Sequence, residues 1–276
     1  MFTLNCKGRL LVAENALVMG IINVTDDSFY AGSRQTGTDA VVKKASQMLE
    51  EGAEILDIGG QSTRPGSSLL TAEAEYSRVV PAITLLAKEF PGAIISVDTF
   101  YASVASGAIA AGAHMVNDIS GGEMDANMLS TVAGLNVPYI CMHMKGTPQT
   151  MQSMADYTNV TTEVLDYFIR KVAACRKAGI HDVIIDPGFG FSKTIQHNFQ
   201  LLKNLRTFSI LQLPVLAGLS RKSTIYKTLG VTAEEALNGT SVLNTLALEN
   251  GAGILRVHDV KEAKEAVVLF AAYKNA

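Results

Sequence analysis

The sequence predicts an α/β protein, namely a (β/α)₈ TIM barrel that forms a single domain over residues 1–276 and carries a short N-terminal β-hairpin over residues 1–15. Eight apolar runs of β type recur and end on polar or glycine-rich clusters: LVMGIIN, AEILDIGG, IISVD, HMVND, YICMH, VIIDPG, VLAGLS and GILRVHD. Amphipathic segments follow several of these runs, which is typical of parallel strands covered by helices. The length of 276 residues is also close to the ~250 residues of one closed barrel.

The individual elements are predicted from local patterns. The loosely alternating MFTLNCKGRLL, with a turn at Lys7-Gly8, predicts a hairpin that caps the bottom of the barrel. Amphipathic spacing predicts helices over residues 39–51, 72–90, 101–111 and 160–178. The candidate helix starts are Thr38/Asp39, Thr71 and Thr232, and the candidate helix ends are Gly52, Gly112 and Gly179.

An open doubly wound sheet is the alternative architecture. Such a sheet binds its ligand at one topological switch point, so polar tips would concentrate on two or three strands. Here nearly every strand has a polar tip, and no GxGxxG motif follows the first strand. Because the loops after barrel strands meet at the face that holds active sites, the pattern favours a closed barrel and an enzyme.

The composition limits the classes of partner that the protein is expected to bind and indicates its cellular compartment. A net charge of −3 gives no overall positive field for nucleic acid or an anionic membrane, so neither is an expected partner. The three cysteines lack CxxC spacing, which favours reduced, structural thiols and a cytoplasmic location. The N-terminus does not have the pattern of a signal peptide, and no run is long enough to span a membrane.

Polar side chains at the ends of the predicted strands are the candidate site residues. Asp98, Asn117, Asp118 and Asp186 predict a wall of carboxylates and an amide, which suits metal binding, acid–base chemistry or recognition of ligand N–H groups. A cap or turn role is the alternative for Asp98 and for Asp186, which lies in DPG. His143 is expected to be structural.

Cationic groups occur in three further clusters. STRPG supplies Arg64 after a Gly-Gly pair, and GLSRKS places Arg221 and Lys222 at a predicted helix start, where barrels often bind phosphate. RVHD directs Arg256 and His258 to one side of a strand, which predicts an anion-binding pair. Solvent-exposed turns are the alternative for the first two clusters. Asn23 is an oxygen donor, so the expected metal is Mg²⁺ bridging a phosphate.

The motifs NVTDDSF, DIGGQSTRPG, SVDT, NDISG, MHMKGTPQTMQ, DPGFGF, GLSRKS and RVHDV run in this order from about Met19 to the end of the chain. Together they closely resemble the dihydropteroate synthase family, and STRPG, GLSRKS and RVHDV are the most specific of them. The resemblance implies a transferase of folate biosynthesis. Its reaction would join the (7,8-dihydropterin-6-yl)methyl group of a pterin diphosphate to 4-aminobenzoate and release diphosphate, with diphosphate leaving before the amine attacks.

The resemblance also implies a role for each matching residue. It gives Lys222, Arg256 and His258 as catalytic residues and Asn23 as the contact for Mg²⁺. The implied pterin site consists of Asp98, Asn117, Met142, Asp186, Phe191, Leu216, Gly218 and Lys222. The implied diphosphate site consists of Asn23, Thr63, Arg256 and His258. The implied 4-aminobenzoate site, which would also bind sulfonamides, consists of Phe29, Thr63, Arg64, Pro65, Lys222 and Ser223. A homodimer formed through the outer helices is a further expectation.

Three residues depart from the family pattern: Asp26 replaces the usual proline, Gln61 the common glutamate and Ser192 the usual glycine. None of them is a predicted ligand, but Asp26 puts a negative charge near the expected diphosphate. Two alternative functions are a pterin-dependent corrinoid methyltransferase and a pterin-binding barrel without catalytic activity. The first has no use for an anion-binding pair, and the second would bind a pterin without releasing diphosphate.

Overall fold

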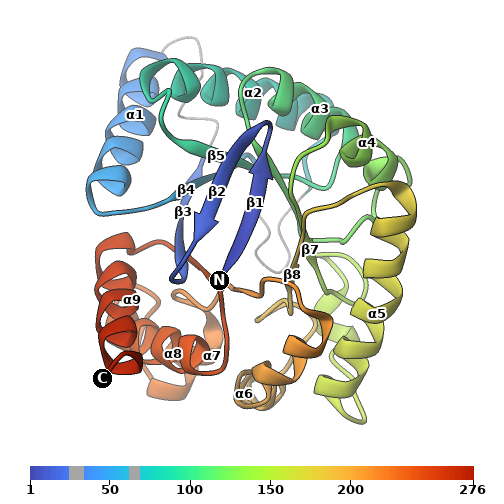
Figure 1. The fold of residues 1–276 in the computed structure, drawn as a ribbon, viewed down its shortest axis with the longest axis vertical. Coiled ribbons are helices and arrows are strands. Elements are labelled where there is room, and N and C mark those ends of the chain that lie inside the picture. Colours follow the sequence, from blue (N-terminus) through green and yellow to red (C-terminus); the bar gives the residue numbers. More distant parts are fainter. Residues whose placement is uncertain (25–33, 62–68) are drawn as a thin grey trace.

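The computed structural model describes residues 1–24, 34–61 and 69–276, with the side chains of residues 34–38 left out. Eight parallel strands form one sheet in the order β8-β7-β6-β5-β4-β3-β10-β9 (Figure 1). Their bounds are β3 Leu17–Asn23, β4 Ile55–Gly59, β5 Ile94–Asp98, β6 Met115–Asp118, β7 Tyr139–Met142, β8 Val183–Asp186, β9 Leu216–Ala217 and β10 Ile254–Val257. A parallel bridge between Ile185 and Val215 joins β8 to β9. The sheet is therefore a nearly closed barrel, and the predicted fold class is confirmed.

Helices surround the strands (Figure 1). Their bounds are α1 Arg34–Glu50, α2 Ala72–Glu89, α3 Ala102–Ala110, α4 Met128–Leu135, α5 Val160–Ala178, α6 Ile195–Lys203, α7 Ser223–Leu229, α8 Leu237–Glu249 and α9 Val260–Lys274, with 3₁₀ turns η2 Met151–Met154 and η3 Leu205–Leu211. Thr71 caps α2 as predicted, since its side chain accepts from the Ala74 N–H at 3.2 Å. Gly52, Gly112 and Gly179 adopt positive φ just beyond their helices, as expected for helix ends.

Two predicted helix starts are wrong. Helix α1 begins at Arg34 rather than at Thr38/Asp39, so the helix includes Gly37 as well. Thr232 closes a turn instead of a helix: its N–H and its hydroxyl both donate to Glu235 Oε2 at 3.0 Å. Arg221 Nη1 fixes this turn by donating to the Ala233 and Glu234 carbonyls at 3.1 and 2.7 Å. Helix α8 consequently starts only at Leu237.

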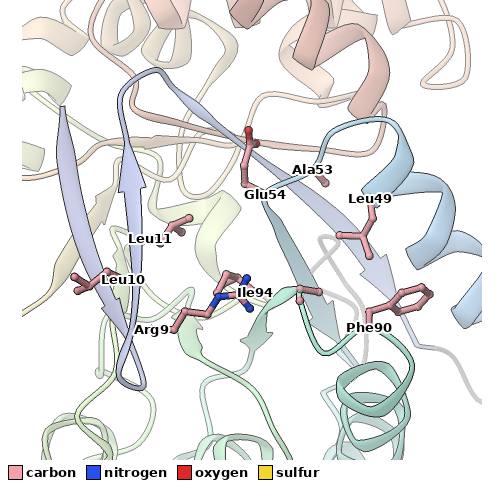
Figure 2. Close-up of a pocket in the computed structure, with 10 residues that line it drawn as sticks. Arg9, Leu10, Leu11, Leu49, Ala53, Glu54, Phe90 and Ile94 are labelled. Carbon is pink, nitrogen blue, oxygen red and sulfur yellow. The ribbon is translucent and has the colours of Figure 1, made fainter.

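The predicted hairpin consists of β1 Phe2–Cys6 and β2 Arg9–Ala13 and lies across one end of the barrel (Figure 1). Its buried Leu4 and Cys6 pack on the apolar barrel interior. A cavity of about 440 Å³ lies between hairpin residues 9–11 and the segments that enter β4 and β5, including Glu54 and Phe90 (Figure 2). This cavity is at the N-terminal ends of the strands, opposite the polar strand tips.

The described chain has two further features that bear on the sequence predictions. Cys6, Cys141 and Cys175 are buried free thiols, as expected. No helix in the described ranges combines the length and the hydrophobicity needed to cross a bilayer.

Candidate active site at the C-terminal face of the barrel

The barrel interior changes from apolar to polar along its axis. In its lower half, one buried apolar side chain from each strand joins a continuous cluster: Met19, Ile55, Ile94, Met115, Ile140, Ile184, Leu216 and Ile254. Two residues further along alternate strands lie Asp57 on β4, Asn117 on β6, Asp186 on β8 and Arg256 on β10. Residues two apart on a strand share a face, and alternate strands of such a barrel contribute the side chains of one layer. We call these four residues the polar layer.

Arg256 is held between two carboxylates. Its Nε donates to Asp57 Oδ2 at 2.7 Å, and its Nη2 donates to Asp98 Oδ2 at 2.6 Å. Asn117 Nδ2 donates to the same Asp57 oxygen at 3.0 Å. Burial lowers the pKa of Arg256, but the Asp57 and Asp98 carboxylates outweigh burial and raise it above its usual value. The guanidinium is therefore a permanent cation with a fixed orientation.

Asp98 and Asp186 have perturbed protonation equilibria. Asp98 lies at the tip of β5, one inward position above the buried Ser96. Burial raises the pKa of Asp98 to about 7, although the Arg256 guanidinium opposes this. Burial also raises the pKa of Asp186, and the Lys222 ammonium opposes it. Together with the Asn117 amide, these carboxylates can accept hydrogen bonds from the edge of a flat heterocycle.

The loop of residues 187–194, between β8 and α6, joins Asp186 to Lys222. The Gly188 N–H donates to Asp186 Oδ1 at 2.7 Å, and Lys222 Nζ donates to the Phe189 carbonyl at 2.5 Å. Lys222 Nζ also lies 4.9 Å from the centre of the Phe191 ring. Burial lowers the pKa of Lys222 to about 8, against the opposing effect of Asp186. The ammonium form therefore still dominates at pH 7.

Several predicted residues join this site. Met142 is buried in a cluster with Phe100 and Ile119, and Phe191 packs against that cluster. The Gly218 backbone lies beside Lys222: a Cβ atom added there would be 3.6 Å from Lys222 Nζ. Leu216 is one inward position below Gly218 and lies in the apolar cluster of the barrel interior, so it forms part of the bottom of the candidate site. Ser223 follows Lys222 as the first residue of α7.

The two residues of the predicted anion-binding pair, Arg256 and His258, lie in different surroundings. Arg256 faces the acids, whereas His258 is exposed beyond the tip of β10, with Nδ1 3.0 Å from Ser220 Oγ. Although His258 as a whole is exposed, its imidazole ring is partly desolvated by its neighbours. This desolvation and the nearby Arg256 lower the pKa of His258 to about 4, so the ring is neutral at pH 7. Asn23 is exposed at the tip of β3.

Two expectations about polar residues are wrong. Asp118 does not face the mouth, because successive strand residues point to opposite faces and Asn117 points inward. Its carboxylate accepts from Ser120, Gly122 and Tyr139 at 2.7 Å. Arg221 is not a free anion ligand: Nε and Nη2 each donate to Asp259 at 2.8 Å, which joins the loop after β9 to the tip of β10.

Some predicted residues lie outside the described part of the chain: Phe29, Thr63, Arg64, Pro65 and Asp26. Gln61 is described, and its Oε1 accepts from the Leu70 N–H at 2.9 Å. A glutamate oxygen could accept the same bond, so the departure from the family pattern at Gln61 retains this contact.

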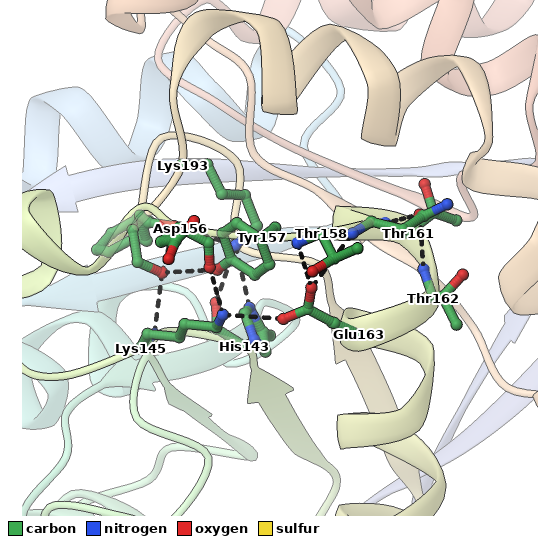
Figure 3. A network of polar contacts seen from close by, with 12 residues as sticks. His143, Lys145, Asp156, Tyr157, Thr158, Thr161, Thr162, Glu163 and Lys193 are labelled. Atoms are coloured by element: carbon green, nitrogen blue, oxygen red, sulfur yellow. Dashed lines mark hydrogen bonds and ion pairs between the residues drawn. The ribbon is translucent and has the colours of Figure 1, made fainter.

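Sequence reasoning missed two residues that organise the site. Asp57 lies inside DIGGQSTRPG, and its signal in the sequence is a carboxylate in the middle of an otherwise apolar strand. Lys193 directly follows DPGFGFS, and no pattern in the sequence indicates its contacts. Lys193 reaches across to His143 at the end of β7, as Figure 3 shows. His143 is buried and contacts Tyr167 edge-on, which agrees with the structural role expected for it.

The comparisons with known proteins agree with this geometry. A family model described as pterin binding enzyme matches residues 19–258. The chain belongs to the pterin-binding enzyme family. Dihydropteroate synthase of Escherichia coli strain K12 is 42% identical over 263 residues, which cover 95% of this chain and 93% of that one. The shared length therefore includes the whole polar layer.

Solved structures of this pterin-binding family have the same fold. Xanthomonas albilineans dihydropteroate synthase with 4-aminobenzoic acid is 40% identical, with a TM-score of 0.91 over 99% of this chain and 98% of that one. The Yersinia pestis dihydropteroate synthase in complex with a sulfonamide drug is 38% identical, with a TM-score of 0.93 over all of both chains.

Proposed function

We propose that this chain is a dihydropteroate synthase, a transferase of folate biosynthesis that condenses (7,8-dihydropterin-6-yl)methyl diphosphate with 4-aminobenzoate. The observation that carries the proposal is the polar layer with Asp98 and Lys222 above it, in a chain 42% identical to the E. coli enzyme of that name. Carboxylate, amide and ammonium groups match the alternating N–H donors and acceptors of a pterin edge. Met142 and Phe191 supply apolar contacts for the flat ring.

The proposed reaction requires little acid–base chemistry from the protein. The bond between the pterin methylene carbon and the diphosphate oxygen breaks, and the electron pair leaves with diphosphate. The neutral amine nitrogen of 4-aminobenzoate then bonds to that carbon and loses one proton to solvent. Arg256 is already fixed by two carboxylates, so it stabilises developing negative charge without reorganising. His258 would donate a hydrogen bond to the leaving group.

A magnesium ion fits the donor set only if the substrate supplies most of its ligands. Within the described ranges, no cluster of three or more His, Cys, Asp or Glu side chains could hold a metal ion. Asn23 offers an exposed amide oxygen at the tip of β3, and Mg²⁺ commonly uses one or two protein oxygens together with phosphates. When bound there, Mg²⁺ would neutralise charge on the diphosphate.

The second substrate would bind above Lys222 and Ser223, with Phe29, Thr63, Arg64 and Pro65 completing its site. The Xanthomonas structure contains 4-aminobenzoic acid and the Yersinia structure a sulfonamide drug, which supports both as ligands of this chain. We further propose that the pterin diphosphate binds first. Asp98, Asn117 and Asp186, which are assigned to the pterin, lie at the ends of strands, and Lys222 is held by the Phe189 carbonyl.

Diphosphate release tests the function directly. The protein is incubated with 6-hydroxymethyl-7,8-dihydropterin diphosphate and Mg²⁺, with and without 4-aminobenzoate, and both products are quantified. The expected result is equimolar dihydropteroate and diphosphate only when the amine is present. Pterin binding without release would indicate a barrel without catalytic activity. A protein that ignores the diphosphate but transfers a methyl group from methyltetrahydrofolate would be a corrinoid methyltransferase.

The homodimer and the cytoplasmic location also remain proposals. Val242 and Leu246 on α8, with Val268, Leu269 and Tyr273 on α9, are exposed apolar side chains on neighbouring outer helices. Burying them in a dimer would remove this apolar area from water. Light scattering coupled to gel filtration should give twice the monomer mass, and Leu246→Glu should shift it toward the monomer. The buried free thiols fit a reducing compartment.

A further inference from the structure

Lys193 is a buried lysine that makes no ion pair with any residue that the structure describes. Its side chain is 4% exposed, and no carboxylate among the described residues lies within ion-pair distance of it. Burying an ammonium is costly unless its three N–H groups are satisfied. A buried lysine ammonium therefore needs hydrogen-bond acceptors inside the protein, which points to a role within the fold.

Backbone carbonyls and one imidazole surround this ammonium, and the imidazole is that of His143, labelled with Lys193 in Figure 3. Lys193 Nζ donates to the Gly188 and Phe191 carbonyls, each at 3.0 Å, and lies 3.0 Å from His143 Nδ1. The His143 carbonyl is more distant, at 3.5 Å. Burial and the Lys193 charge hold the pKa of His143 at about 2, so the ring is neutral and its Nδ1 can accept. The three close acceptors thus match the three N–H groups of the protonated amine, whose pKa is lowered to about 7 by burial.

The loop conformation places these acceptors. Gly188, Gly190 and Ser192 all have positive φ, at 72°, 82° and 47°. This curls the loop so that two of its carbonyls converge on one point behind it. Gly188 is pressed against β7's end: a Cβ atom there would lie 2.1 Å from the His143 carbonyl oxygen. Lys193 therefore fastens the β8 loop to the end of β7.

The other side of the same loop carries the pterin-facing contacts. Gly188 N–H holds Asp186, and the Phe189 carbonyl accepts from Lys222. Phe191 supplies the ring beside the Lys222 ammonium. Without the Lys193 ammonium, the buried Gly188 carbonyl would lose this donor and the Phe191 carbonyl would keep only Ser192 Oγ, so the loop would shift to reach other donors.

We propose that Lys193 is a positioning residue for the pterin substrate. Its ammonium holds residues 188–191 in the conformation that sets Asp186, Phe191 and Lys222 relative to one another. Lys193 acts through the loop and does not touch the pterin. The inference rests on the proposed function for the identity of the ligand.

The test compares Lys193→Met, which keeps the length and removes the donors, with Lys193→Arg, which keeps donors and charge. Lys203→Met is the matched control, because Lys203 is an exposed lysine on the following helix. Each variant is examined by circular dichroism and thermal unfolding, by calorimetric titration with a pterin lacking the diphosphate, and by steady-state kinetics for both substrates.

The proposal expects folded Lys193→Met to bind the pterin at least tenfold more weakly. KM for the pterin diphosphate should rise correspondingly, while KM for 4-aminobenzoate at saturating pterin changes less than threefold. Lys193→Arg should recover part of the loss, and Lys203→Met should behave as wild type. A lower Tm with unchanged pterin binding and kinetics would overturn the positioning role. If Lys193→Met does not fold, Lys193→Gln, which keeps two donors on a neutral side chain, is judged by the same criteria.

Failure of this inference is separable from failure of the proposed function. If the wild-type protein forms no dihydropteroate, the proposed function fails, but the calorimetric comparison still measures whether Lys193 governs pterin binding. If the wild type is active and Lys193→Met binds pterin equally well, only the inference about Lys193 fails.

Discussion

Asp57→Asn isolates the negative charge that orients Arg256. Asp57 Oδ2 accepts from both Arg256 Nε and Asn117 Nδ2, and an asparagine oxygen in the same place could accept both bonds. The substitution therefore removes the charge and keeps the shape. A hydrogen bond to a charged group contributes about 1.5–3 kcal/mol. The asparagine would still accept from the charged guanidinium, so the Arg256 contact should fall within this range from its upper to its lower end, a loss of about 1–1.5 kcal/mol.

That loss should appear as a five- to roughly tenfold lower kcat/KM for dihydropteroate formation, since about 1.4 kcal/mol corresponds to a factor of ten. Folding stability should change by less than about 2 kcal/mol, because removing a buried charge offsets the weaker bond. Urea denaturation measures the second quantity. Ser96→Ala is the control: Ser96 is a buried neighbour of Asp57 on β5, its hydroxyl has no partner in the described chain, and its loss should leave kcat/KM unchanged.

A double-mutant cycle with Arg256→Ala decides whether Asp57 acts through Arg256. In the Arg256→Ala background, Asp57→Asn should have almost no further effect on kcat/KM, which gives a coupling energy of about 1–1.5 kcal/mol. If the two losses simply add, Asp57 does not act by orienting Arg256, and the role assigned to the polar layer is wrong.

Four further predictions follow from the site. Arg256→Ala should lower kcat/KM by a factor that corresponds to about 2–4 kcal/mol of lost transition-state stabilisation. It should also lower the free energy of unfolding by about 3–5 kcal/mol, because Asp57 and Asp98 lose a buried partner. Steady-state kinetics and urea denaturation measure these two quantities, and unchanged kinetics would contradict the role of Arg256. Lys222→Ala should reduce kcat/KM by roughly 10²-fold through the loss of a charged hydrogen bond of up to about 3 kcal/mol, and wild-type kinetics would exclude its placement between the substrates. Ser192→Gly should change the free energy of unfolding by less than about 1 kcal/mol. Glycine adopts the positive φ without strain, and this gain offsets the lost hydrogen bonds to Lys145 and Tyr157. A change above about 2 kcal/mol would be inconsistent with this balance. His258 has a pKa of about 4 in the free protein and should gain proton affinity when the diphosphate binds, so the diphosphate should bind more tightly as the pH falls from 7 toward 5. Binding to the wild type should take up a proton that binding to His258→Gln does not. Calorimetry in two buffers of different ionisation enthalpy measures this uptake, and equal uptake by both proteins would refute the role of His258.

The fold was predictable because it depends on repeated local patterns. Apolar runs, polar tips and amphipathic segments recur in order, and the barrel forms from those runs. Helix ends at Gly52, Gly112 and Gly179 were predictable because positive φ favours glycine. The turn that replaces the expected helix start at Thr232 was not predictable from capping alone, since the Arg221 contacts that fix the turn come from a different loop.

The site was only partly predictable. Strand-end residues such as Asp98 and Asp186 were found because their positions in the strands already place them at one face. The position of Asn117 excludes Asp118 from the candidate site, because adjacent strand residues cannot both point into the barrel. Lys193 could not be found by such arguments, because its acceptors include His143, 50 residues earlier in the chain, and carbonyls that converge only in the curled loop.

The distribution of these groups has a physical consequence for the order of events. The acids and Asn117 assigned to the pterin lie on strands whose register is fixed by hydrogen bonds to both neighbours, so little entropy is lost when they bind a ligand. Lys222 and Phe191 lie on loops, yet Phe189 and Lys193 contacts hold them in place. A preorganised pterin site at the bottom of the mouth can be filled without the second substrate, whereas the amine must approach from above it. These rigid contacts support the proposed order of binding, in which pterin diphosphate binds before 4-aminobenzoate.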